Sequence, residues 1–117
     1  ALQSYKSVIQ IDPSYESEAT LYMGAIYAEK NDLSNAVIQF EKVSRMKEEK
    51  FKHLAYYYLG RIYTHKNENE KAEQAYYKAL SHKKDFVDAV LALGGMFEDK
   101  NKDQKAIQLY SSYQEQS

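Results

Sequence analysis

Five consecutive residues, Leu59-Gly60-Arg61-Ile62-Tyr63, contain the pattern on which the fold of this chain depends. A glycine that follows an apolar residue and precedes an aromatic one by three positions recurs twice more, as Met23-Gly24…Tyr27 and Leu93-Gly94…Phe97. The three glycines are 36 and 34 residues apart. Because the same register is kept three times, the chain is predicted to consist of repeats.

A second pattern follows each glycine at a fixed distance. An alanine stands twelve residues after the glycine, an aromatic residue follows four positions later, and an asparagine lies between the two patterns. Helical spacing places each pattern on one face of a helix, and asparagine tolerates the left-handed conformation that ends a helix. Each repeat is therefore predicted to be a helix–turn–helix of about 34 residues. The residues concerned are Ala36…Phe40, Ala72…Tyr76, Ala106…Tyr110, Asn31, Asn67 and Asn101.

This combination resembles the tetratricopeptide repeat family, whose pattern is Trp-x-x-Leu-Gly-x-x-Tyr, then Ala-x-x-x-Phe and a closing proline. The tryptophan position holds Thr20, Tyr56 and Val90 here. The resemblance implies an all-α fold, a right-handed α-solenoid of antiparallel helix pairs. About three and a half repeats are expected in a single structural domain: the second helix of a truncated repeat at 1–12, then repeats at 15–50, 51–84 and 85–117.

Helix-breaking residues are scarce, with one proline and four glycines in 117 residues, as expected of a chain of long helices. The two additional residues in the longer glycine spacing are expected near 46–51. Seven helices are predicted, over residues 1–11, 15–30, 33–47, 51–66, 69–82, 85–100 and 103–115.

Composition excludes several classes of function. Lys and Arg total 16 against 17 Asp and Glu, so the chain lacks the positive charge of a typical nucleic-acid-binding protein. It contains no cysteine, and its three histidines stand in no metal-ligand motif. No arrangement of nucleophile, acid and base is recognisable, so we predict a protein that is not an enzyme and needs no cofactor or metal. No apolar run approaches the length of a membrane span.

Function is expected on the stripe of each first helix that faces away from the core of its own repeat. At 100° per residue, this stripe combines carboxylates with apolar and small side chains, with Tyr57 and Arg61 at its centre. An apolar floor with an acidic rim favours a protein or peptide partner with apolar anchors and basic flanks. The leucines of the stripe have an alternative interpretation, as core residues that touch the neighbouring repeat. The predicted groove comprises Glu18, Leu21, Ala25, Glu29, Leu54, Tyr57, Arg61, His65, Asp88, Leu91 and Glu98.

The preferred interpretation is thus a non-enzymatic protein–protein interaction module that binds a peptide or helix in a concave groove. The alternative is an assembly or scaffold module that acts through self-association of its repeats. For this alternative we expect a homodimer through the N-terminal helix, because no preceding helix covers it. The residues assigned to self-association are Leu2, Tyr5, Val8 and Ile9.

Overall fold

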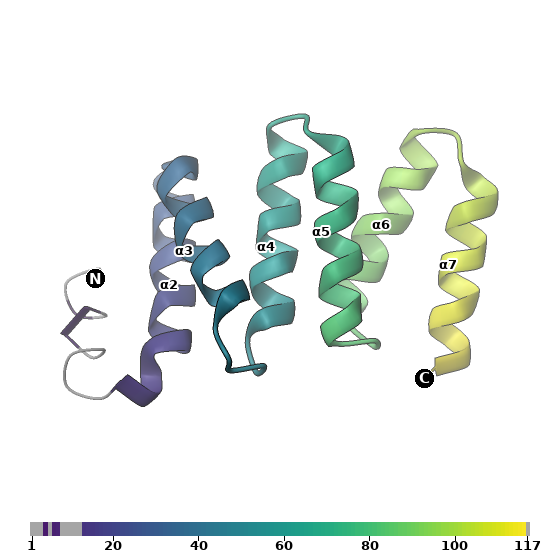
Figure 1. The fold of residues 1–117 in the computed structure, drawn as a ribbon. Helices are drawn as coiled ribbons and strands as arrows, with labels where there is room; N and C mark the ends of the chain where they lie inside the picture. The colour runs from purple at the N-terminus through teal and green to yellow at the C-terminus, as the bar shows by residue number, and fades with distance from the viewer. Residues whose placement is uncertain (1–3, 5, 8–12, 117) are drawn as a thin grey trace.

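The structure, a computed structural model, describes Ser4, Lys6, Ser7 and residues 13–116. All regular elements in the described part of the chain are helices, and none is a strand. In Figure 1 the α-helices stand in a row in sequence order, and successive connections alternate between the upper and the lower ends of the helices. This arrangement confirms the predicted solenoid of antiparallel helix pairs. The elements are η1 (Pro13–Tyr15), a 3-10 helix, then α2 (Glu16–Glu29), α3 (Leu33–Arg45), α4 (Lys52–His65), α5 (Asn69–His82), α6 (Val87–Asp99) and α7 (Asp103–Gln116).

The ends of α2 to α7 lie within two residues of the predicted ends. The described residues contain six α-helices rather than the seven expected. The remaining helix, predicted over 1–11, has most of its positions outside the described residues and stays a prediction.

The turn inside each helix pair has the same construction in all three repeats. Asn31, Asn67 and Asn101 have φ angles of 62°, 62° and 57°, which confirms the predicted left-handed conformation. The next residue's N–H reaches back to a carbonyl one turn inside the helix, as in a Schellman motif. This bond satisfies a carbonyl that would otherwise lack a partner at the helix end. The three bonds run from Asp32 to Tyr27 (2.8 Å), from Glu68 to Tyr63 (2.8 Å) and from Lys102 to Phe97 (2.7 Å).

The connections between helix pairs differ in length, as the glycine spacing predicts. α3 ends at Arg45 and α4 begins at Lys52, whereas α5 ends at His82 and α6 begins at Val87. The first connection is therefore the longer by two residues, and the prediction of an insertion near 46–51 is confirmed.

The repeated register of glycine and aromatic residues has a direct packing explanation. A Cβ atom at Gly24 would lie 2.7 Å from a ring carbon of Phe40, and one at Gly60 would lie 2.6 Å from a ring carbon of Tyr76. Gly94 faces Tyr110 in the same way. Each glycine therefore allows the two helices of its own pair to approach closely, with the aromatic ring filling the space.

The core extends along the stack instead of lying at one centre. Phe40, Val43 and Leu93 are its largest fully buried side chains. One cluster joins α2 through α5, and a second, around Tyr76 and Leu93, joins α5 through α7. Within the described residues, no helix combines the length and the apolar character that crossing a membrane requires.

Candidate functional site

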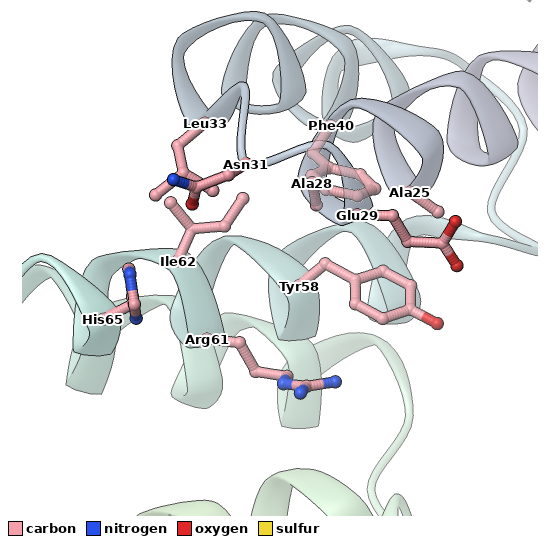
Figure 2. A pocket seen from close by; sticks show the side chains of 10 residues that line it. All are labelled: Ala25, Ala28, Glu29, Asn31, Leu33, Phe40, Tyr58, Arg61, Ile62 and His65. Carbon is pink, nitrogen blue, oxygen red and sulfur yellow. The ribbon is translucent and has the colours of Figure 1, made fainter.

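A cleft of about 530 Å³ lies between α2 and α4, the first helices of two successive pairs. We call it the α2–α4 cleft. α2 and the turn after it supply one wall, α3 supplies Leu33 and Phe40, and four residues of α4 supply the opposite wall. The lining residues, drawn in Figure 2, are Ala25, Ala28, Glu29, Asn31, Leu33, Phe40, Tyr58, Arg61, Ile62 and His65.

The cleft exists because small side chains on α2 face larger ones on α4. Ala25 and Ala28 leave space, while Phe40 and Ile62, which are 1% and 6% exposed, close the base. The ring of Tyr58 stacks on that of Phe40, with centroids 5.2 Å apart and an interplanar angle of 24°. The result is an apolar recess with an aromatic wall, the kind of surface that holds an apolar anchor.

Charged groups stand at the mouth of the α2–α4 cleft. Glu29 extends from α2 toward the same side as Tyr58 does from α4, and Arg61 follows one turn after Tyr58 (Figure 2). The predicted groove residues Ala25, Glu29, Arg61 and His65 are thus brought together. Of these, Glu29, Arg61 and His65 are exposed, so their polar groups are accessible to a partner.

The prediction that Leu21 lines the groove is wrong. Leu21 is 4% exposed and belongs to the core cluster that also contains Ala55 and Leu59 of α4. The following repeat covers this position, which is the alternative interpretation of the stripe leucines. Leu54, half-buried, packs against the same cluster.

Tyr57 does not line the α2–α4 cleft, because its ring points toward the next repeat. It lies 5.3 Å from the ring of Phe86, 5.6 Å from that of Tyr58 and 5.9 Å from that of Tyr76, centroid to centroid. The Arg61 guanidinium carbon lies 5.9 Å from the Tyr57 centroid. Arg61 is therefore the residue that links the cleft to this aromatic group.

The remaining predicted groove residues stand apart from the cleft. Asp88, Leu91 and Glu98 are exposed on α6, and Leu91 is 58% exposed. Glu18 is half-buried near the start of α2. The self-association residues Leu2, Tyr5, Val8 and Ile9 all lie outside the described residues.

Tyr58 is the principal cleft residue that the predicted groove omits. Its signal is present in the sequence, because Tyr58, Arg61, Ile62 and His65 follow the spacing i, i+3, i+4, i+7 of one helix face. A groove centred on this face instead of on Tyr57 would have included Tyr58.

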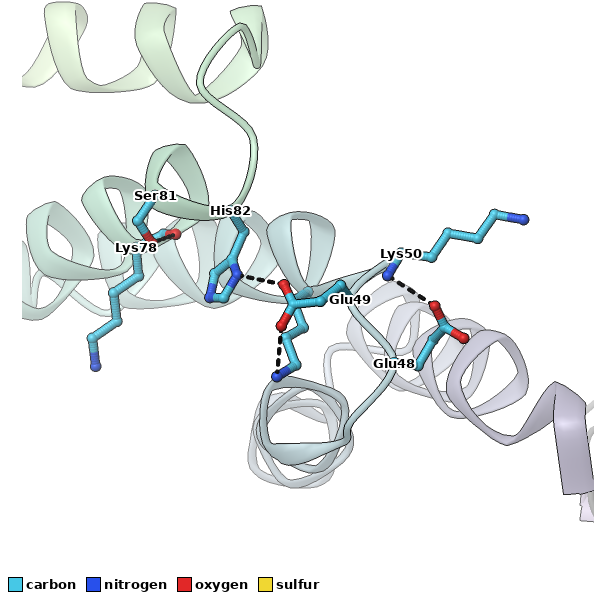
Figure 3. A network of polar contacts seen from close by, with 7 residues as sticks. Glu48, Glu49, Lys50, Lys78, Ser81 and His82 are labelled. Carbon is cyan, nitrogen blue, oxygen red and sulfur yellow. Dashed lines mark hydrogen bonds and ion pairs between the residues drawn. The ribbon is translucent and has the colours of Figure 1, made fainter.

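A polar network joins the longer inter-pair connection to the end of α5 (Figure 3). Nδ1 of His82 lies 2.9 Å from Oε2 of Glu49, and Nζ of Lys52 lies 3.2 Å from Oε1 of the same carboxylate. These two partners, His82 first, hold the pKa of Glu49 below its ordinary value.

Nearby, His53 packs edge-on against Phe86, with ring centroids 5.0 Å apart. Burial lowers the pKa of His53, and the positive charges of Lys83 and His82 lower it further.

Stability is expected to fall as the pH drops below the ordinary histidine pKa of 6.5. In the unfolded chain His53 takes up a proton near that pH, whereas the folded chain binds it only at lower pH, so protonation favours unfolding in between. Glu49 titrates below 4.5 and lies outside this window. Urea unfolding at pH 7.5 and 5.5 measures how much the free energy of unfolding falls between the two pH values. This decrease should be larger for the native chain than for His53→Gln. Equal decreases in the two proteins would contradict the assignment to His53.

The described residues contain no group of three or more His, Asp or Glu side chains placed to hold a metal ion. The apolar recess and the charged groups at its mouth make the α2–α4 cleft the candidate site.

Comparison with known proteins gives one family and a set of similar structures. No curated protein matches the sequence significantly. Among solved structures, "Crystal structure of MamA" superposes with a TM-score of 0.79 and 24% identity over 97% of this chain. "Crystal structure of MamA protein" gives a TM-score of 0.76, 24% identity and the same 97%. The chain spans 65% and 61% of those two chains, less than two thirds of their length.

At this level of identity the MamA structures are evidence for the fold alone. The family evidence comes from residues 53–86, which match the sequence profile of the tetratricopeptide repeat. This segment contains the Leu59-Gly60…Tyr63 and Ala72…Tyr76 elements together with the Asn67 turn. The resemblance to the family is thus confirmed for residues 53–86, where the chain carries a tetratricopeptide repeat within an α-solenoid of antiparallel helix pairs.

Proposed function

We propose that this chain is a non-enzymatic protein–protein interaction module that binds a peptide or helix in the α2–α4 cleft. A tetratricopeptide repeat supports an interaction module in general, because stacked helix pairs form extended binding surfaces. The observation that carries the finer proposal is the recess itself, about 530 Å³, with an apolar base and charged groups at its mouth.

The chemistry of the cleft selects the features of its partner. Phe40 and Ile62 at the base, with Tyr58 as a wall, favour an apolar side chain as the anchor. Glu29 at the mouth favours a lysine or arginine flanking that anchor. Arg61 on the opposite wall is placed to bind a backbone carbonyl or a carboxylate of the partner.

A direct test uses a short fluorescein-labelled peptide with leucine anchors and lysine flanks, and follows its binding by fluorescence anisotropy. Ala25→Leu, which fills the recess, and Tyr58→Ala, which removes its wall, are each expected to weaken binding by roughly fivefold or more. Glu29→Lys should weaken binding mainly at low salt, because a charge at the mouth acts chiefly on association.

Matched controls separate the cleft from general effects. Tyr77→Ala and Glu70→Lys make the same chemical changes at exposed positions of α5 that do not line the cleft. Circular dichroism confirms that each variant is folded. The proposal fails if the folded cleft variants bind the peptide as tightly as the controls do.

A further inference from the structure

A second cleft, of about 390 Å³, lies between α3 and α5, the second helices of two successive pairs. We call it the α3–α5 cleft. Its floor includes Tyr56 and Tyr63 of α4, whereas Tyr58 and Ile62 of the same helix line the α2–α4 cleft. The two clefts therefore use different faces of α4, and a partner bound in one leaves the other accessible.

The α3–α5 cleft is positively charged although the whole chain has a net charge of −1. Among its lining residues, Arg45, Lys71 and Lys78 provide three positive charges against the single carboxylate of Glu41. This local excess is a property of the cleft and not of the overall composition. It is the charge pattern that attracts an acidic partner.

The positive groups remain accessible for binding. Arg45 Nη2 lies 3.9 Å from Oε2 of Glu41, and Lys71 Nζ lies 4.0 Å from Oε2 of Glu68, both at the outer limit of an ion pair. The side chains of Arg45 and Lys71 are 75% and 66% exposed, so these pairs hold them weakly. Lys78 forms no ion pair with any residue that the structure describes, and Figure 3 shows its side chain directed away from Glu49.

Aromatic rings hold the lysines at the sides of the cleft. Nζ of Lys78 lies 5.7 Å from the centroid of Tyr56, and Nζ of Lys71 lies 5.8 Å from that of Tyr63. A cation over a ring keeps its position while it can still bind an anion. The Tyr56 ring is itself fixed by stacking on His82, with centroids 5.4 Å apart and an interplanar angle of 8°.

Lys78 places a positive charge at the Tyr56 end of the cleft. Burial raises the pKa of the Tyr63 phenol, and the negative charges of Glu41 and Glu68 nearby raise it further. Lys71 therefore has carboxylates close to it, whereas Lys78 has none within ion-pairing distance among the described residues. Arg45 and Lys78 stand on opposite sides of the cleft, one from α3 and one from α5.

We propose that the α3–α5 cleft binds an acidic segment of a partner protein, with a carboxylate held between Arg45 and Lys78 and an apolar side chain against Tyr56. This site is distinct from the α2–α4 cleft and selects the opposite charge. The chain can then hold a basic segment and an acidic segment at the same time, on different faces of α4.

The test uses a short fluorescein-labelled peptide of glutamates around a central leucine, with a glutamine-for-glutamate version as the uncharged probe. The double variant Arg45→Gln and Lys78→Gln is expected to weaken anisotropy-detected binding of the acidic peptide by roughly fivefold or more at moderate salt. The control double variant Lys42→Gln and Lys102→Gln removes two exposed charges outside the cleft and should change binding by less than about twofold. The uncharged probe should bind weakly to all three proteins.

Two further measurements complete the test of this proposal. The double variant Arg45→Gln and Lys78→Gln should bind the lysine-flanked peptide of the α2–α4 cleft as tightly as the native chain does. A loss of binding at one cleft can then be distinguished from a loss at the other. A single-stranded oligonucleotide should bind more weakly than the acidic peptide. The assignment is overturned if both double variants lose affinity for the acidic peptide equally, or if the α3–α5 cleft variant loses none. It is also overturned if the oligonucleotide binds as tightly as the acidic peptide.

Discussion

Replacing Phe40 by alanine is expected to lower the free energy of unfolding by about 3–5 kcal/mol. Phe40 is 1% exposed, its ring fills the space at Gly24, and it also stacks on Tyr58 of the next helix pair. Truncation therefore removes packing both within a repeat and between repeats. Because glycine at position 24 has no side chain to occupy the space, the cavity is expected to persist.

The size of this loss can be compared with the stability of the whole chain. A domain of this length is expected to be stable by roughly 6–18 kcal/mol, so the variant loses a large share. Urea unfolding followed by circular dichroism measures the change. Ile107→Ala, at a residue that is 56% exposed, is the control and should cost less than about 1 kcal/mol. A Phe40→Ala loss as small as that of the control would mean that this ring does not join the repeats.

The sequence predicted the helix pairs well because each pair is defined by local rules. The asparagines at 31, 67 and 101 end a helix through their own backbone conformation, whatever lies elsewhere in the chain. The pairing of Gly24 with Phe40 is equally local, because both residues belong to one helix–turn–helix. A repeated pattern with a fixed internal spacing therefore fixes the helix ends to within two residues.

The candidate site was harder to predict because it depends on which helix covers which face. Leu21 and Leu91 occupy the same position in the repeat, yet they are 4% and 58% exposed. α4 lies over the first, whereas no helix among the described residues covers the second to a comparable extent. Position within a repeat identifies the face of a helix, but the neighbouring repeat decides whether that face is core or surface. Tyr57 shows the same effect, since Phe86 of the following repeat draws its ring away from the α2–α4 cleft.

Replacing Gly60 by leucine is expected to lower the free energy of unfolding by roughly 1–3 kcal/mol or more. The nearest atoms to a new side chain are ring carbons of Tyr76, which is 3% exposed and has little space into which to move. The leucine would therefore force α4 and α5 apart at the centre of the stack. The melting temperature and the urea midpoint should both fall, and an unchanged melting temperature would contradict the close approach at Gly60.

Gly95 provides a matched control within the same protein. Gly95 is also a helical glycine, next to Gly94 of the repeat pattern, but a Cβ atom built there meets no atom within 4 Å apart from the adjoining backbone of its own helix. Gly95→Ala is therefore expected to raise the free energy of unfolding by about 1 kcal/mol, because alanine is the better helix former. Gly60→Ala gains the same helix propensity but meets Tyr76, so the difference between the two alanine variants measures the packing term alone. If both variants stabilise the chain equally, the repeated glycine reflects something other than helix packing. If the free energy of unfolding of Gly60→Ala is lower than that of Gly95→Ala, the contact with Tyr76 is the reason that position 60 requires glycine.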